Sequence, residues 1–162
     1  MSPTVRRLLS WLLAVTLVII LSPPRGEAAL QGVYFTAANE QLLELNSATM
    51  PFWSGDTLYV SSNVFSKTDL GLNYVRNNKM GLAVLYTSRT DLRFDLTHQT
   101  VYDKQGVSYP GRAIERGGVI FFPLNLVCSY FGLTWSYTET TTAPLIRVRS
   151  SGAILDDRTF ID

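Results

Sequence analysis

The residues of this sequence that could carry out chemistry are few. Cys128 is the only cysteine and His98 the only histidine, and a thiol enzyme would need both side chains to meet in space. Cys128 falls on the apolar helical stripe Leu124, Val127, Cys128 and Phe131, where desolvation raises the pKa of a thiol and keeps it inert. We therefore expect no catalytic residue, and an enzyme that uses Cys128 and His98 is the alternative.

Carboxylates also fail to form a recognisable metal or glycosidase site. Asp156 and Asp157 are adjacent, but they lack the spaced oxygen ligands of a calcium loop. Asp91 and Asp95 share one face of a strand pattern, and Arg93 stands between them in a position to pair with both. The sequence therefore predicts no metal and no cofactor.

Two neighbouring aromatic residues are the best candidates for ligand contact. Phe52 and Trp53 lie in the stretch MPFWSGD, which Pro51 and Gly55 mark as a loop. An exposed aromatic pair in a loop can stack on a sugar or a peptide. We interpret Phe52 and Trp53 as a candidate stacking site, and folding of this loop back onto the core is the alternative.

The first 29 residues have the pattern of a secretory signal peptide. Two arginines, Arg6 and Arg7, precede an apolar run from Leu8 to Leu21, which is shorter than the about 20 residues of a membrane-spanning helix. Prolines follow, and then small residues suited to cleavage. The prediction is a signal peptide at 1–29 and a secreted, extracellular protein associated with the cell envelope. The alternative is an uncleaved anchor, the one case in which membrane contact is expected.

Charge argues against a nucleic-acid partner. The chain has 14 basic and 13 acidic residues. Three of the basic residues and one of the acidic residues lie in the predicted signal peptide, so the mature chain has one more acidic than basic residue. Such a balance provides no basic surface for phosphates.

Period-2 alternation of apolar and polar residues dominates the mature chain. In TDLRFDLT, Leu92, Phe94 and Leu96 alternate with polar residues, as in a half-buried antiparallel strand. Similar patterns occur at 33–36, 41–46, 57–60, 81–87, 97–103, 119–122 and 144–150. Two short helices interrupt them, one between Pro123 and Gly132 and a weaker one between Ser61 and Gly71. The fold class is therefore α+β, with mostly antiparallel strands and two short helices.

The two helices belong to a pattern that occurs twice. Leu58, Tyr59 and Val60 correspond to Ile120, Phe121 and Phe122 ahead of each helix, and Gly71-Leu72 corresponds to Gly132-Leu133 after it. We interpret this as a two-copy strand-helix-strand repeat, at about 57–91 and 119–154. The repeats are expected to share one compact domain, 30–162, and two tandem lobes are the alternative.

The repeated segments resemble a known family. LYVSSNVF with LGLNY, and IFFPLNLV with FGLTWSYTETTTAPLIRV, are similar to the copper amine oxidase N-terminal-like domains, or stalk domains, of secreted and envelope proteins of Gram-positive bacteria. Asn63 and Asn125 stand where that family has an arginine. The resemblance implies a domain outside a catalytic body, and a single histidine cannot build the copper site of that enzyme type.

These observations predict a secreted, non-catalytic cell-envelope domain. It would act as a structural spacer or as a docking module for protein or cell-wall glycan. The alternative function is a small extracellular hydrolase or thiol enzyme that uses Cys128 and His98. The pattern assigns no oligomeric state.

Overall fold

The computed structural model describes residues 32–66 and 68–161, which form three β-sheets and several short helices. The predicted signal peptide, 1–29, lies outside the described residues. The described residues belong to one compact unit. A unit with its own hydrophobic core has the anatomy of a domain that folds alone.

Sheet A joins the first and the last strands of this unit. Its strands, in spatial order, are β12 (Thr134–Thr138), β13 (Leu145–Arg149), β1 (Phe35–Ala38) and β2 (Gln41–Leu42). β1 and β13 run parallel, whereas every other strand pair among the described residues is antiparallel. The expectation of mostly antiparallel strands is confirmed.

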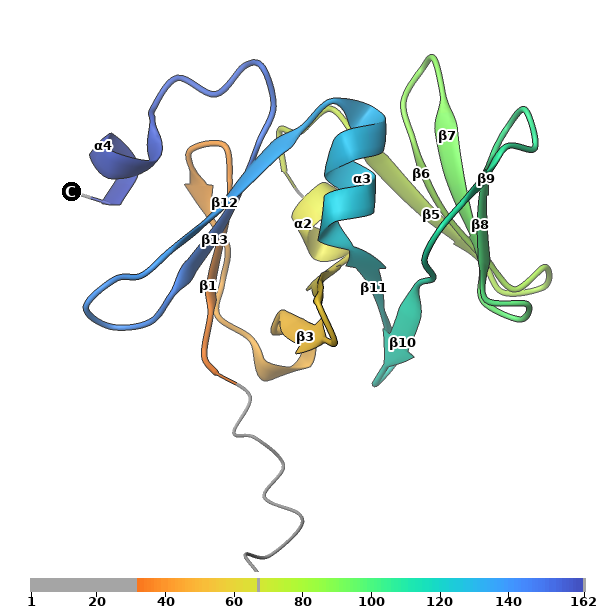
Figure 1. Cartoon of the computed structure of the whole chain (residues 1–162), viewed down its shortest axis with the longest axis horizontal. Coiled ribbons are helices and arrows are strands. Elements are labelled where there is room, and N and C mark those ends of the chain that lie inside the picture. The colour runs from red at the N-terminus through yellow and green to blue at the C-terminus, as the bar shows by residue number, and fades with distance from the viewer. Residues whose placement is uncertain (1–31, 67, 162) are drawn as a thin grey trace, which may run out of the picture. The chain divides into compact units, whose positions relative to one another are not determined.

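Sheets B and C are built from hairpins. Sheet B contains, in spatial order, β10 (Ile114–Arg116), β11 (Val119–Pro123), β4 (Thr57–Ser61) and β3 (Phe52–Ser54). Sheet C is a five-stranded meander of β5 (Asn73–Asn77), β6 (Leu82–Tyr86), β7 (Asp91–Asp95), β8 (Thr100–Asp103) and β9 (Ser108–Tyr109). Figure 1 shows helices α2 (Asn63–Ser66) and α3 (Leu124–Phe131) between sheet A and sheet C.

The main core centres on Phe122, which is fully buried. Its ring centroid lies 6.1 Å from that of Phe65, 5.8 Å from Tyr74 and 4.7 Å from Phe94. Buried residues from all three sheets and both helices belong to the same cluster, among them Ala38, Leu58, Val60, Phe65, Leu85, Leu92, Phe94, Ile120, Val127, Ile146 and Val148. The second face of sheet B carries a smaller cluster of Phe52, Tyr59 and Phe121, because successive residues of a strand point to opposite faces.

The clearest local patterns of the sequence are confirmed. β7 buries Leu92 and Phe94 completely, as the alternation in TDLRFDLT predicts. α3 ends at Phe131, and Gly132 follows in the left-handed conformation with φ of 69°. The Gly132 N–H donates to the carbonyl oxygen of Cys128, which satisfies one of the free carbonyls at the end of the helix.

Other local predictions are wrong. The described residues contain three α-helices rather than two, since α4 (Asp157–Ile161) follows sheet A. In the stretch 41–46, the strand covers only Gln41 and Leu42, and His98 lies in the turn between β7 and β8 rather than on a strand. Phe52 and Trp53 belong to strand β3 rather than to a loop. Each miss involves a short segment whose conformation depends on tertiary partners.

Candidate functional site

The two residues of the thiol-enzyme alternative lie in different environments. Cys128 is 2% exposed within the main core, and burial raises the pKa of its thiol to about 12. The His98 side chain is 76% exposed, and its Nδ1 lies 2.9 Å from Oδ2 of Asp95. The Asp95 pKa is lowered, first by the hydrogen bond from the His98 backbone N–H and then by the His98 ring. The structure therefore brings His98 to Asp95 and not to the thiol.

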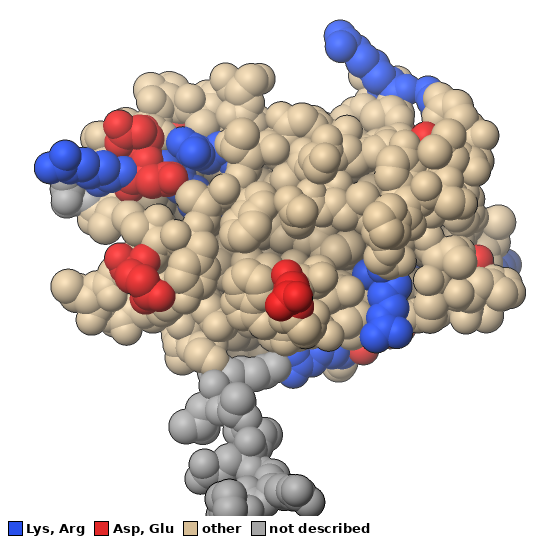
Figure 2. Space-filling model, in the orientation of Figure 1, with Lys and Arg blue, Asp and Glu red and all other residues tan. Residues whose placement is uncertain are grey.

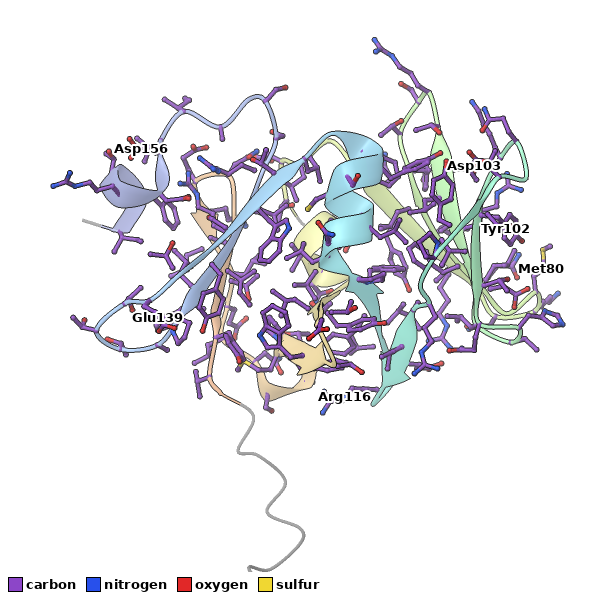
Figure 3. All side chains as sticks on the ribbon, viewed as in Figure 1. Met80, Tyr102, Asp103, Arg116, Glu139 and Asp156 are labelled. Atoms are coloured by element: carbon purple, nitrogen blue, oxygen red, sulfur yellow. The ribbon has the colours of Figure 1, made fainter. Side chains whose placement is uncertain are left out.

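The acidic candidates serve the local structure around them. Asp91 pairs with Arg93 at 3.0 Å, while Asp95 accepts the N–H groups of Thr97 and His98. Arg93 therefore pairs with one of the two carboxylates, where the sequence predicts both. Asp103 accepts the N–H groups of Gln105 and Val107, which close the turn after β8. Figure 3 shows Asp103 at the opposite end of the unit from Asp156.

Asp156 and Asp157 have separate partners. Asp156 accepts the Thr159 N–H at 2.8 Å at the start of α4, and this backbone bond is the main cause of its lowered pKa. Asp157 instead accepts from Nη1 of Arg147 at 3.0 Å. Across residues 32–66 and 68–161, no group of three or more His, Cys, Asp or Glu side chains is placed to hold a metal ion.

Phe52 and Trp53 do not form a joint platform. Phe52 is 9% exposed, stacks on Tyr59 at 5.4 Å between ring centroids and has the guanidinium of Arg116 4.2 Å from its centroid; Figure 3 labels Arg116 beside β10. Trp53 follows Phe52 in β3 and therefore points to the other face, where it is 44% exposed. Only Trp53 is available to stack on a ligand.

Among the described residues, a cavity lined mainly by polar groups lies between sheet A and α2. This polar cleft has a volume of about 270 Å³. Its polar lining residues come from β1, β2, the segment that leads to the 3₁₀ helix η1 (Ser47–Thr49), the end of β4 and the start of α2: Thr36, Gln41, Glu44, Asn46, Thr49, Ser61 and Asn63. Leu42, Leu43 and Val64 complete the lining.

The polar cleft exists because β2 is short. Leu43 still donates its N–H to the Thr36 carbonyl at 2.8 Å, after which the chain leaves sheet A. Asn46 then begins η1, and its Oδ1 accepts the Ala48 N–H at 2.8 Å. The segment from Leu43 to Asn46 borders the polar cleft. Because hydrogen bonds hold both ends of this segment, they fix the width of the cleft.

The lining of the polar cleft combines a buried floor with an exposed rim. Thr36 is 8% and Ser61 2% exposed, whereas Gln41, Glu44 and Asn46 are exposed. Hydroxyl, carboxamide and carboxylate groups together donate and accept hydrogen bonds in many directions. Such a lining suits an uncharged ligand rich in hydroxyl and amide groups.

A second depression has a different chemistry. It has a volume of about 410 Å³ and lies where the start of β4 meets the first turns of α3. Tyr59, Pro110, Pro123 and Leu126 contribute much of its lining. Since this surface offers fewer hydrogen-bonding side chains, the polar cleft is the better candidate for specific recognition.

Sequence reasoning missed the polar cleft. The alternation in QLLELN favoured a full strand, which would have placed Gln41, Glu44 and Asn46 on a regular sheet. The sequence signal that could have found the site is the set of amide and carboxylate residues Gln41, Glu44 and Asn46, which ends at the turn-forming Asn46-Ser47 pair.

Comparison with protein-family models, with characterised proteins and with solved structures finds no match for this chain. Within the described ranges, no helix has the length and apolar character needed to cross a membrane. Function is therefore inferred from the polar cleft and from the sequence motifs.

Proposed function

We propose that this protein is a secreted, non-catalytic domain of the cell envelope that docks onto cell-wall glycan through the polar cleft. The lining of the cleft is the observation that carries this proposal. Cell-wall glycans present hydroxyl and N-acetyl groups, which the carboxamides of Gln41 and Asn46 and the carboxylate of Glu44 can match with hydrogen bonds. Trp53, exposed on β3, adds a surface on which a sugar ring can stack.

The family assignment is part of the same proposal. The motifs LYVSSNVF and IFFPLNLV, each followed by Gly-Leu and an aromatic residue, resemble the copper amine oxidase N-terminal-like, or stalk, domains. We infer a two-copy repeat at about 57–91 and 119–154. The order of elements supports it, because β4, α2, β5 and β6 follow one another as β11, α3, β12 and β13 do.

The pairing of the two copies is consistent with such a repeat. β4 and β11, the first strands of the two segments, lie next to each other and run antiparallel. Gly71 and Gly132, which follow the two helices, both have positive φ, at 76° and 69°. Secretion rests on the signal-peptide pattern of 1–29, outside the described residues.

Co-sedimentation with isolated Gram-positive cell walls tests the proposal. Residues 30–162 should bind walls saturably, and Gln41→Ala and Glu44→Ala should each weaken binding about 3- to 10-fold, as the loss of one ligand hydrogen bond does. Trp53→Ala should weaken it by a similar factor, since stacking contributes about 1 kcal/mol. Each variant is first checked for unchanged thermal unfolding.

Two exposed residues far along the sequence from the cleft provide matched controls. Gln105→Ala and Glu139→Ala remove the same kinds of side chain from exposed positions and should leave wall binding unchanged. Saturable binding that survives both Gln41→Ala and Glu44→Ala would contradict the proposed site. An absence of wall binding would contradict glycan docking and favour a spacer.

A further inference from the structure

Most outer strands of the three sheets are protected against pairing with another chain. An edge strand exposes unpaired backbone N–H and C=O groups, and proteins block such edges with short strands or charged side chains. β2 and β9 have two residues each, and β3 has three. β10 has three residues and carries Glu115 and Arg116. These four edges are therefore poor templates for a further strand.

β5 is longer but charged. It has five residues, of which Arg76 extends to Glu115 with two bonds of 2.9 and 3.0 Å. Nη1 of Arg76 also reaches the Gly118 carbonyl at 3.5 Å. The side chain therefore ties β5 to β10 and to the turn after it, and β5 is an edge strand that carries a charged residue.

β12 has none of these protections. Its five residues, Thr-Trp-Ser-Tyr-Thr, include no charged residue, proline or glycine, and all five pair with β13 in one unbroken register. Threonine and aromatic residues favour extended strands. Figure 2 shows one face of the unit, on which acidic and basic side chains gather at the upper left and are otherwise few. β12 is thus a regular, uncharged edge at the end of sheet A.

The sequence of β12 is also complementary to itself. If two copies pair antiparallel about Ser136, Thr134 lies opposite Thr138 of the other copy, and Trp135 lies opposite Tyr137. Tyr137 is 40% exposed, so it has free surface to contribute. Aromatic pairs and hydroxyl pairs are among the cross-strand neighbours that stabilise antiparallel sheets, by about 0.2–1 kcal/mol each.

Ser136 gives a second, independent indication that β12 pairs with another strand. Its Oγ is shielded from solvent and has no hydrogen-bond partner within the part of the chain that the structure describes. A buried hydroxyl without a partner costs about 1–3 kcal/mol. In the antiparallel pairing about Ser136, rotation of the Ser136 side chain about χ1 turns each hydroxyl from this buried position toward the other copy, where one hydroxyl can donate to the other.

We propose that β12 is a self-association surface. A second copy of this chain adds its own β12 in antiparallel register about Ser136, and the two copies of sheet A become one continuous sheet. The contact is isologous, as in most homodimers. The near balance of acidic and basic residues in the mature chain does not oppose it.

A single engineered cysteine tests the register. In Ser136→Cys, the two thiols lie on directly opposed residues, whose Cα atoms are about 4.5–5.5 Å apart in antiparallel sheets, within the range of a disulfide. A mild oxidant should convert most of the folded protein to a disulfide-linked dimer at low protein concentration. The native Cys128 is buried and should not react.

Thr134→Cys is the matched control for this crosslink. The two copies of residue 134 would be four positions apart along the strands, about 13 Å, beyond the reach of a disulfide. Crosslinking of Ser136→Cys that is no faster than that of Thr134→Cys would overturn the proposed register.

The unmodified protein provides a second test. Light scattering after size-exclusion chromatography of residues 30–162 should show a dimer that dissociates on dilution. Tyr137→Lys should weaken the dimer at least tenfold, because a lysine is desolvated in the contact, whereas Val75→Lys on the edge of β5 should not. A monomer at every concentration would contradict the proposal, even if a foreign extended segment were found to bind β12.

Discussion

Arg147 of β13 and Asp157 of α4 form an ion pair with 3.0 Å between Nη1 and Oδ1, and the arginine side chain is fully buried. Arg147 also donates to the carbonyls of Asn39 and Leu155, both at 2.8 Å. The ring of Phe160 lies 4.3 Å from its guanidinium carbon. Arg147 therefore helps to fix the last described segment, 150–161, to sheet A.

Loss of Arg147 should destabilise the protein and release that segment. Arg147→Met keeps much of the side-chain volume but removes the donor to the Asn39 and Leu155 carbonyls and to the Asp157 carboxylate, so we expect a loss of about 2–4 kcal/mol in the free energy of unfolding. Urea denaturation measures this loss, and proteolysis near Leu155 should become faster. Arg158→Met, at an exposed position, is the control. Equal stability of the two variants would contradict the assigned role.

Acid should loosen the same segment. The pKa of Glu40 is lowered mainly by the backbone N–H groups of Leu155 and Ile154, and that of Asp156 by the Thr159 N–H. A carboxylate with a lowered pKa contributes stability above its unfolded pKa, and this stability is lost as the pH falls through the folded pKa. These contributions are therefore complete above the ordinary values of 4.5 and 3.8 and disappear at lower pH.

Amide hydrogen exchange of Ile154 and Leu155 measures this effect. After correction for the intrinsic rates, protection should fall as the pH drops below about 4. Glu40→Gln should lower the protection at neutral pH and reduce its dependence on pH. Protection that stays constant from neutral to acid pH would be inconsistent with the hydrogen bonds of Glu40.

Cys128 should be inert in the folded protein. Because burial raises the pKa of its thiol to about 12, almost none of it is thiolate at neutral pH. We expect a thiol reagent to label native protein at least about 100-fold more slowly than urea-unfolded protein. Rapid labelling of the native state, slowed by His98→Ala, would instead support the thiol-enzyme alternative.

The two glycines after the helices should be required for their backbone conformation. Gly71 and Gly132 have positive φ, and an added Cβ would meet nothing within 4 Å at either position. Gly71→Ala and Gly132→Ala should therefore each cost about 1–2 kcal/mol through the left-handed conformation alone. Gly152→Ala, where φ is not positive, should be nearly neutral. Thermal or urea unfolding of the three variants measures these losses in the free energy of unfolding.

Strongly periodic segments could be predicted from the sequence. The alternation around Leu92 and Phe94 and the helical stripe that ends at Gly132 each bury an apolar face, and burial of that face determines the conformation. Arg93 pairs with Asp91 as predicted, because neighbours on one face of a strand are close in any sheet.

Tertiary contacts determine what the sequence could not reveal. α4 has five residues, too few to form in isolation, and it is held by Arg147. Phe52 and Trp53 become a strand only because β3 pairs with β4, which separates the two rings onto opposite faces. The polar cleft forms where β2 stops pairing, and the alternation in QLLELN conceals that point, although the Asn46-Ser47 pair marks the turn beyond it.

Glycan docking in the polar cleft is most directly tested by a nuclear magnetic resonance titration. Soluble cell-wall glycan fragments are added to isotope-labelled residues 30–162, and backbone amide signals are followed. We expect saturable shifts at Gln41, Glu44 and Asn46, with the turn after Asp103 unchanged. An absence of shifts at saturating glycan, or shifts that avoid the cleft, would contradict the proposed function.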